Sequence, residues 1–287
     1  MAKQASWSTV PLTSYWILRS LVVMCLIPPI LCSQTKSRSI PDDNLAIPVL
    51  ITIGNTTGSG FFVNTPAATY LVTAKHVLFD PIRRILIDST FTLTSYSKDL
   101  SDLTPNVFTV ESVKLGAANI IQHPSEDVAV VKIAAPDAKN TNIMDTLPGV
   151  TINSAAKLGI VHTEAENIRK FADVLVGNDV FIMGYPTSLG LQSMPQIDPR
   201  RPLLRKGVIA GQNHVTHSII LDCPAYFGNS GGPVLEVDKE GFGGRVSIIG
   251  VVNQYVPYAD GGKTFAIMAN SGYSIATPMD YVLELVK

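Results

Sequence analysis

The chain has 287 residues, of which 46% are hydrophobic and 16% are charged, and its formal net charge is −1. This length suffices for a sizeable buried core. The balanced charge, without a basic stripe in the sequence, argues against a nucleic-acid partner. Short runs of valine, isoleucine, leucine and threonine predict a β-rich fold.

The first 33 residues have the composition of a secretory signal peptide. Lys3 and Arg19 precede an apolar run at residues 21–27, and two prolines then lead to Ser33, near which cleavage is predicted. Arg19 and the prolines keep the apolar stretch well below the ~20 residues that a membrane-spanning helix needs. The sequence therefore predicts export, to the periplasm or out of the cell. A retained membrane anchor and a lipidated Cys32 are the alternatives, and membrane contact is expected only if this segment is retained.

Two groups of strand-like segments follow a polar leader or linker at residues 34–44. Strands of the first group, within about 45–133, are predicted at 47–53, 60–63, 69–73, 85–87, 108–113 and 128–133. Residues 134–173 are predicted to cross between the groups. Strands of the second group, within about 174–287, are predicted at 180–184, 207–211, 218–222, 234–237, 246–254 and 273–276. Pro278 then opens a short helix at 279–286 with one apolar face. We predict an all-β fold of two six-stranded antiparallel β-barrels with a short C-terminal helix.

A serine between glycines is the first candidate catalytic residue. Residues 227–234 read FGNSGGPV, so the Ser230 hydroxyl can stand clear of neighbouring side chains. On such a turn the backbone N–H groups of Gly228 and Ser230 can point into one small space and form an oxyanion hole. Acyl transfer by a nucleophilic serine requires this arrangement.

Two partners for such a serine stand upstream. His76 follows an apolar run at 70–74, and Asp127 opens another at 128–133; the spacings are 51 residues (127−76) and 103 residues (230−127). Alone, each residue fits an ordinary turn or cap, but together, in order and at strand edges, they indicate catalysis. The order His, Asp, Ser is that of the chymotrypsin-like double β-barrel. We predict that His76 exchanges the serine proton and that Asp127 orients its imidazole.

These segments resemble the trypsin-like serine peptidases, and among them the HtrA-type branch, from about residue 45 to 287. The similarity lies in GSGFFV at 58–63, TAKHV at 73–77, DVAVVK at 127–132, DVFIMGYP at 179–186, GNSGGP at 228–233, GVV at 250–252 and SIATP at 274–278. The resemblance implies a chymotrypsin-like fold and a serine endopeptidase that cleaves polypeptides through an acyl-enzyme. Because the chain ends soon after the predicted helix, the PDZ domain usual in that branch is not expected.

The resemblance also implies a primary specificity pocket. Its walls would be Pro224 and Ala225 on one side, and Asn253, Gln254 and Tyr255 on the other. A pocket for lysine or arginine needs a buried negative charge, and no carboxylate follows Asp222 before the nucleophile. We therefore expect cleavage after small or medium apolar residues, with Tyr255 narrowing the entrance.

Neither a metal nor another cofactor is predicted. His214 and His217 stand three apart in an expected strand or hairpin, and would then point to opposite faces, which is poor geometry for a shared ion. Removal of the signal segment leaves Cys223 as the only cysteine, so we expect a buried thiol and no internal disulfide. The loop at 186–202 carries Arg200 and Arg201, which form a small basic cluster with Arg205 and Lys206. This cluster either meets an acidic substrate or partner or is simply solvated.

Two alternatives to a working peptidase follow from the sequence. A silent or resting-state protein of the same fold could act as a binding or scaffold protein, because the bulky Tyr226 and Phe227 could collapse the oxyanion turn. An esterase on the α/β-hydrolase plan is disfavoured, since the order Ser, Asp, His is absent.

Overall fold

The computed structural model describes residues 40, 44–99, 101–137, 144–154, 161–187, 193–238, 245–261 and 266–286. The predicted signal peptide at 1–33 and most of the predicted leader at 34–44 lie outside these residues. Residues 39–287 form one compact unit. Within the described part of the chain, no helix has the length and apolar character needed to cross a bilayer.

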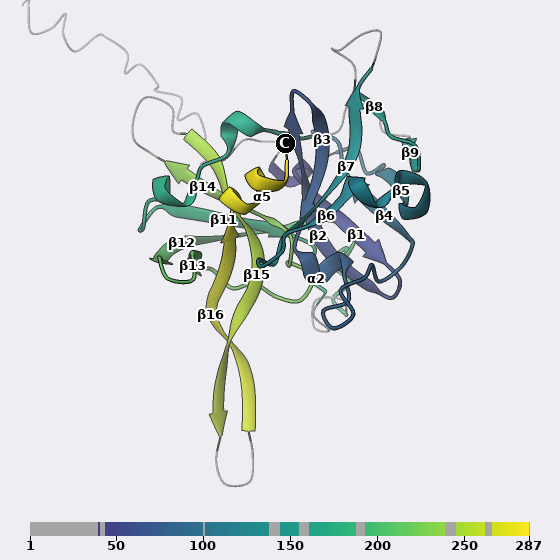
Figure 1. The fold of residues 1–287 in the computed structure, drawn as a ribbon. Helices are drawn as coiled ribbons and strands as arrows, with labels where there is room; N and C mark the ends of the chain where they lie inside the picture. The colour runs from purple at the N-terminus through teal and green to yellow at the C-terminus, as the bar shows by residue number, and fades with distance from the viewer. Residues whose placement is uncertain are drawn as a thin grey trace, which may run out of the picture. The chain divides into compact units, whose positions relative to one another are not determined.

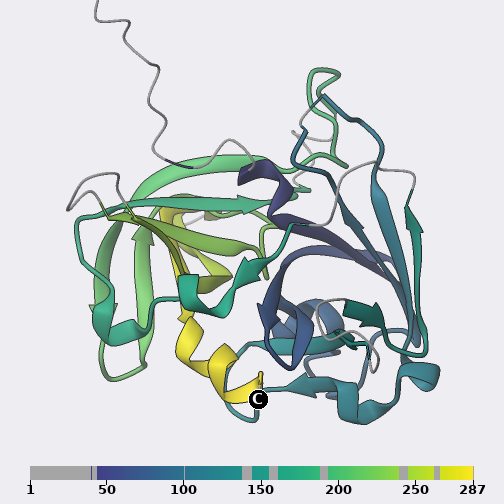
Figure 2. The same cartoon turned by 90° about the horizontal axis from the view of Figure 1, so that it is seen from above.

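The first half of this unit is a curled sheet of ten strands. Their order is β6-β7-β3-β2-β1-β4-β5-β9, with β8 added to β7 and β10 added to β2. The strands are β1 (Pro48–Ile53), β2 (Thr56–Thr65), β3 (Ala68–Thr73), β4 (Thr90–Ser95), β5 (Asn106–Glu111), β6 (Ile120–Gln122), β7 (Ala129–Pro136), β8 (Met144–Thr146), β9 (Val150–Ser154) and β10 (Thr163–Glu164). The described end strands β6 and β9 do not pair with each other, so the sheet is a half-barrel that curls without closing (Figure 2).

The second half is a closed barrel of six strands in the order β11-β12-β13-β16-β15-β14. The strands are β11 (Asp179–Gly184), β12 (Leu203–Asn213), β13 (Ser218–Asp222), β14 (Pro233–Asp238), β15 (Arg245–Gly261) and β16 (Ala266–Pro278). Helix α5 (Met279–Leu285) follows β16, as predicted. Single helical turns are α2 (Lys75–Leu78), α3 (Ser112–Leu115) and the 3₁₀ turns Asn44–Ala46, Ala117–Asn119, Ala165–Asn167 and Phe171–Asp173. The all-β fold of two barrel-like halves is confirmed, and the first half is the open one.

Strands β2, β3 and β7 are buried on both faces. Successive residues alternate sides: Phe62, Leu71 and Val131 enter the core of the first half, whereas their neighbours Val72 and Val130 pack against the second barrel and α5. A strand covered on both sides needs apolar residues at every position. This explains why β3 and β7 read as largely apolar runs, while β5 alternates between buried and half-buried residues along its length.

One predicted strand is wrong. Residues 85–87 form only an isolated bridge, between Leu86 and Phe79. The exposed fractions of Ile85 and Ile87 are 57% and 37%, so no core holds them in a strand. The strand of this region is β4, whose alternating sequence buries Phe91 and Leu93.

The predicted crossing and the last hairpin also contain more strand than the sequence indicated. Residues 134–173 contribute β8, β9 and β10 to the first sheet. Strands β15 and β16 stay paired as far as Gly261 and Ala266, and form a two-stranded ribbon that projects well beyond the barrel (Figure 1).

Candidate active site

His76 and Asp127 are brought together by two neighbouring strands. His76 lies in α2, directly after β3, and Asp127 directly precedes β7, to which β3 is paired through Thr73 and Ala129. The loop before β7 is closed by a hydrogen bond from the His123 N–H to the Val128 carbonyl, 2.9 Å. Two residues that are 51 positions apart in the chain therefore meet at the same end of these two paired strands.

Both carboxylate oxygens of Asp127 bind His76. Nδ1 of the ring lies 2.6 Å from Oδ2, and the His76 main-chain N–H donates to Oδ1 at 3.0 Å. Since an ionised carboxylate can only accept hydrogen bonds, the ring proton sits on Nδ1, and in the neutral ring Nε2 is an acceptor. This geometry fixes both the orientation and the tautomer of the imidazole.

The Asp127 carboxyl stays ionised at neutral pH. Burial raises its pKa, but the hydrogen bonds and charge of His76, together with the charge of Lys75, outweigh burial and hold the pKa below its ordinary value. Lys75 is itself fixed, because its ammonium donates to the His123 carbonyl at 2.9 Å. The site therefore carries a permanent negative charge on the side of the imidazole away from Nε2.

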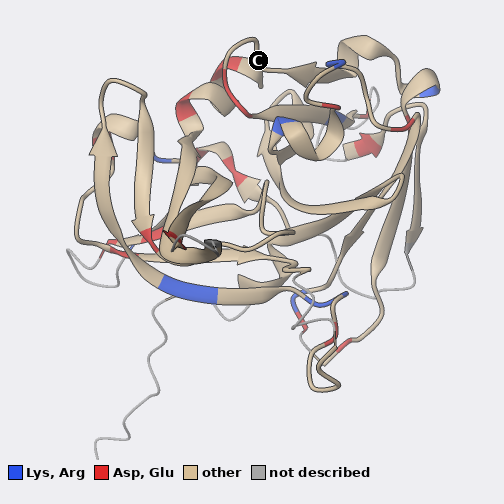
Figure 3. Ribbon diagram, turned by 90° about the horizontal axis from the view of Figure 1, so that it is seen from below, with Lys and Arg blue, Asp and Glu red and all other residues tan. Residues whose placement is uncertain are grey.

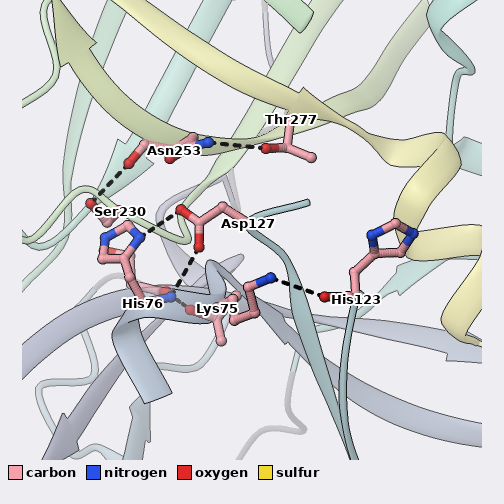
Figure 4. A network of polar contacts seen from close by, with 9 residues as sticks. Lys75, His76, His123, Asp127, Ser230, Asn253 and Thr277 are labelled. Carbon is pink, nitrogen blue, oxygen red and sulfur yellow. Dashed lines mark hydrogen bonds and ion pairs between the residues drawn. The ribbon is translucent and has the colours of Figure 1, made fainter. Parts of the chain in front are cut away.

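Ser230 lies on the turn between β13 and β14, beside the imidazole of His76 (Figure 4). Its hydroxyl donates to the main-chain carbonyl of Asn253 at 3.3 Å, and the Asn253 side chain donates to Thr277 Oγ1 at 3.4 Å. Within the described residues, the hydroxyl is hydrogen-bonded to this carbonyl and not to His76. Hydrogen bonds between a nucleophile and its base are often long in a ligand-free site and tighten when substrate binds.

Two amides of the turn are left open. The Phe227 carbonyl accepts the Thr187 N–H at 2.8 Å, and the Asn229 carbonyl accepts the Gly232 N–H at 2.9 Å. In a planar trans peptide the N–H points away from the carbonyl, so these two bonds direct the N–H groups of Gly228 and Ser230 to the opposite side. Within the described chain neither N–H has an acceptor. The two N–H groups predicted to form the oxyanion hole are therefore available to donate hydrogen bonds to a substrate oxygen.

Gly228 has a backbone conformation that suits only glycine. Its φ is +89°, and a Cβ there would collide with the Tyr185 carbonyl oxygen. The sequence pattern of glycines in this turn thus has a steric cause.

A cavity of about 380 Å³ brings most of the predicted site residues together. It is lined by His76, Asp127, Ala225, Tyr226, Phe227, Ser230, Val252, Asn253, Gln254 and Tyr255. Pro224, the fifth predicted pocket residue, does not line it. Apart from Asp127 at the catalytic end, none of the described lining residues carries a charge.

Further cavities continue this space in three directions. One of about 220 Å³ extends past Phe227 and Tyr255 to Met268 on the projecting ribbon. One of about 430 Å³, on the other side of Ser230, is bounded by Thr56 and Thr57. A third, of about 600 Å³, lies beside His76 and Asp127. Ser230 lines two of these cavities and His76 lines three, so the two residues lie where the cavities adjoin.

The two aromatic residues before the nucleophile lie outside the oxyanion space. The Arg205 guanidinium lies over the Tyr226 ring, 4.3 Å from its centroid. Phe227 is 68% exposed and meets Tyr255 edge to face, with ring centroids 5.7 Å apart. The three residues predicted to react, His76, Asp127 and Ser230, line one cavity, but sequence reasoning missed Phe227 and Met268 as parts of the pocket wall. Their only signal was the exposed apolar side chain itself, which a sequence does not reveal.

The basic residues of loop 186–202 and β12 are engaged with their own chain. Arg200 pairs with Asp198 at 3.1 Å, and Lys206 pairs with Asp179 at 3.1 Å. Arg201 lies over the Tyr96 ring. Figure 3 shows blue and red segments interspersed along the ribbon. This loop does not gather its charge into one patch on the described surface.

His214 and His217 correct one prediction. They lie in the turn of the β12–β13 hairpin, one of the two expected places, and His217 has a φ of +47°. Both rings contact Phe171, with centroids 5.2 and 4.1 Å away, so they do not point to opposite faces. No group of three or more His, Cys, Asp or Glu residues in the described part of the chain could hold a metal ion.

Cys223 is a buried free thiol, as predicted. Burial raises its pKa to about 11, so the thiol is protonated at neutral pH and packs as a small apolar side chain.

A family model described as the trypsin-like peptidase domain matches residues 58–243. The chain belongs to this family. It is therefore a serine-type endopeptidase, a class of enzyme that acts on polypeptides, as the sequence predicted. The comparison with curated protein sequences found no match.

Two solved structures are similar to this chain. One is described as the serine endoprotease from Yersinia pestis, with 18% sequence identity, a TM-score of 0.44 and coverage of 85% of this chain. The other is described as Deg5, with 21% identity, a TM-score of 0.46 and coverage of 85% of this chain. This chain spans 65% of the length of the Yersinia protein and 88% of Deg5.

Proposed function

We propose that this domain hydrolyses peptide bonds through an acyl-enzyme formed on Ser230. The observation that carries the proposal is the 2.6 Å contact between His76 Nδ1 and Asp127, with Nε2 turned toward the cavity that holds Ser230. Both partners belong to the protein, so the contact orients the base independently of the substrate.

The chemistry follows from the positions of the groups. Ser230 Oγ attacks the substrate carbonyl while its proton passes to His76 Nε2, and the imidazolium is stabilised by Asp127. The oxyanion that develops accepts hydrogen bonds from the Gly228 and Ser230 N–H groups, each worth on the order of 3 kcal/mol in the transition state. His76 then protonates the leaving amine, and a water molecule, activated by the same base, releases the acyl group as a carboxylate.

The substrate is a polypeptide with a small or medium apolar residue before the cleaved bond. Support for this comes from the cavities around Ala225, Asn253, Gln254 and Tyr255, whose described lining carries no carboxylate beyond Asp127. A lysine or arginine side chain would enter this space without a compensating charge, which is costly. The Phe227–Tyr255 pair stands at the entrance and limits the size of the side chain that fits.

The first experiment is labelling of the purified protein with a fluorophosphonate, followed by intact-mass measurement. We expect one adduct on the wild type and none on Ser230→Ala. A matched control is Ser125→Ala, a surface hydroxyl in the loop before Asp127, which leaves Ser230 intact and is expected to label like the wild type. Labelling of Ser230→Ala, or none of the wild type, contradicts the proposal.

A resting state is the second candidate, and the Ser230–Asn253 hydrogen bond favours it, because it directs the hydroxyl away from Nε2. A slow labelling phase that becomes fast when a cleavable peptide is present would identify such a state. A single fast phase in both conditions excludes it.

We also propose that the N-terminal segment directs export and is removed near Ser33. Expression of the full chain with N-terminal sequencing of the product tests this. A mature N-terminus close to residue 34 supports it, and an intact Met1 or a lipidated Cys32 contradicts it.

A further inference from the structure

Ser59 lies beneath the nucleophile turn and is completely buried. It belongs to β2 of the first sheet, whereas the turn belongs to the second barrel. Its main-chain N–H donates to the Ser230 carbonyl at 2.9 Å, and its hydroxyl donates to the Gly228 carbonyl at 2.6 Å. One residue of the first sheet therefore holds two carbonyls of the turn.

The hydroxyl proton of Ser59 is committed to Gly228. The Tyr185 N–H donates to Ser59 Oγ at 2.9 Å, so this oxygen already accepts one hydrogen bond. A serine hydroxyl has a single proton. Since that proton goes to the Gly228 carbonyl over 2.6 Å, the hydroxyl is fixed on both sides.

The two bonds from Ser59 complete a regular pattern in the turn. The carbonyls of residues 227–230 each accept one hydrogen bond. The Gly228 and Ser230 carbonyls accept from Ser59. The Phe227 carbonyl accepts from the Thr187 N–H, and the Asn229 carbonyl accepts from the Gly232 N–H. On the opposite edges of these four peptides, the N–H groups of Asn229 and Gly231 donate within the fold, at 2.9 and 2.7 Å. The remaining two, of Gly228 and Ser230, are the open ones. Ser59 thus holds the peptide units 228–229 and 230–231, each of which follows a peptide unit that carries an oxyanion donor.

Ser59 also contacts the strand that leads to the catalytic base. Thr73 Oγ1 donates to the Ser59 carbonyl at 2.7 Å, and both residues are fully buried. Thr73 ends β3, three positions before His76. All three polar groups of Ser59 therefore link the two sides of the site.

We propose that Ser59 is a positioning residue for the oxyanion hole: its hydroxyl holds the peptide unit between the two oxyanion amides. The inference rests on the proposed function, because an oxyanion hole matters only if Ser230 attacks a carbonyl. Ser59 touches no reacting atom and acts through Gly228. Glycine resists rotation of its peptide planes less than any other residue, so an outside anchor is needed at this point.

Removal of the hydroxyl by Ser59→Ala is the first test. We expect kcat for a peptide substrate to fall about 10- to 100-fold with KM almost unchanged, since the loss concerns the transition state alone. Binding of a peptide aldehyde, whose hemiacetal oxygen occupies the oxyanion hole, is expected to weaken by a similar factor. A merely structural role would lower stability without moving these two quantities together.

The matched control is Ser95→Ala. Ser95 is buried in β4 of the same sheet, and its hydroxyl has no hydrogen-bond partner among the described residues. We expect kcat and aldehyde affinity like those of the wild type. Equal values for Ser59→Ala and Ser95→Ala overturn the proposal.

A second variant moves the hydroxyl instead of deleting it, and applies also if Ser59→Ala does not fold. A Cβ added at Gly184 would lie 2.6 Å from Ser59 Oγ, so Gly184→Ala displaces the hydroxyl from Gly228. The same Cβ would lie 3.0 Å from Asn229 Nδ2 and 3.3 Å from its Cα, so comparison with the double variant is needed to separate the two effects. We expect a loss of kcat like that of Ser59→Ala, and a much smaller additional loss when both changes are combined. Full kcat in Gly184→Ala overturns the proposal, as do additive losses in the double variant. Absence of fluorophosphonate labelling in the wild type, in contrast, overturns the proposed function itself.

Discussion

The two sides of the active site are held by different means. His76 and Asp127 sit at the ends of β3 and β7, whose side chains are buried on both faces, so sheet register places them. Ser230 sits on a turn whose successive carbonyls are each held by one hydrogen bond. The strands that place His76 and Asp127 are expected to tolerate loss of a single apolar contact, because many such contacts hold each strand. The second side depends on individual polar atoms, and single changes there are expected to act directly on catalysis.

The largest effect is expected from Asp127→Asn. The amide can present its N–H₂ group to Nδ1, which favours the wrong imidazole tautomer and leaves Nε2 protonated. We expect kcat to fall about 10⁴-fold while the fold is retained. Peptide hydrolysis together with circular dichroism tests this. A fall of less than tenfold would show that the 2.6 Å contact does not orient the base.

Gly228→Ala is expected to have the next largest effect. An alanine at position 228 would have to adopt a φ of +89°, and its Cβ would collide with the Tyr185 carbonyl oxygen. The turn therefore has to shift. We expect kcat to fall about 100-fold, as for the loss of one oxyanion donor. Gly211→Ala is the matched control, because it lies on the barrel with only a 3.9 Å contact at the Cβ position. Equal activities of the two variants would contradict the assignment of the turn.

Tyr255→Ala tests the pocket entrance rather than the reacting groups. Loss of the ring removes its contact with Phe227 and widens the opening. We expect kcat/KM for a substrate with leucine or phenylalanine before the cleaved bond to rise about tenfold relative to one with alanine. Competition between the two peptides in one reaction measures this ratio directly. An unchanged ratio would place the size filter elsewhere.

The smallest effect is expected in stability at low pH. The pKa of Asp127 lies below 3.8 in the folded protein, so the unfolded chain binds the proton more readily. The resulting stabilisation is complete above the unfolded pKa and is lost as the pH falls through the folded one. We expect the wild type to lose stability more steeply than Asp127→Asn as the pH falls below the ordinary pKa of an aspartate. Urea unfolding of both proteins across this range compares the slopes, and parallel curves would contradict the shift.

The sequence predicted the parts of the molecule that local rules govern. The glycines around Ser230 follow from the positive φ of Gly228, and the apolar runs of β3 and β7 follow from burial on both faces. The strand at 85–87 was wrong because apolar pattern alone does not tell whether a core lies beneath Ile85 and Ile87. Strand pairing in the first sheet ends at β6 and β9 and leaves the sheet open. No local sequence pattern predicts where such pairing ends.

Ser59 shows most clearly what sequence reasoning missed. In the chain it is a small polar residue inside a strand segment, and its hydroxyl partner lies 169 positions away. A hydrogen bond over that separation depends on the packing of the first sheet against the second barrel. The long β15–β16 ribbon was missed for a related reason, since its exposed residues have no alternation to mark them.

The order of these parts along the chain has a consequence for biosynthesis. His76 and Asp127 are translated well before Ser230, and Ser59 holds its partner carbonyl at Gly228 only after residues of the second barrel have been made. The Gly231 N–H, moreover, bonds to Val252, so the turn cannot close until β15 has emerged from the ribosome. Domains that depend on such distant pairings fold late and slowly. A nascent chain of this peptidase is therefore expected to lack proteolytic activity until β15 has been synthesised and has paired with the turn.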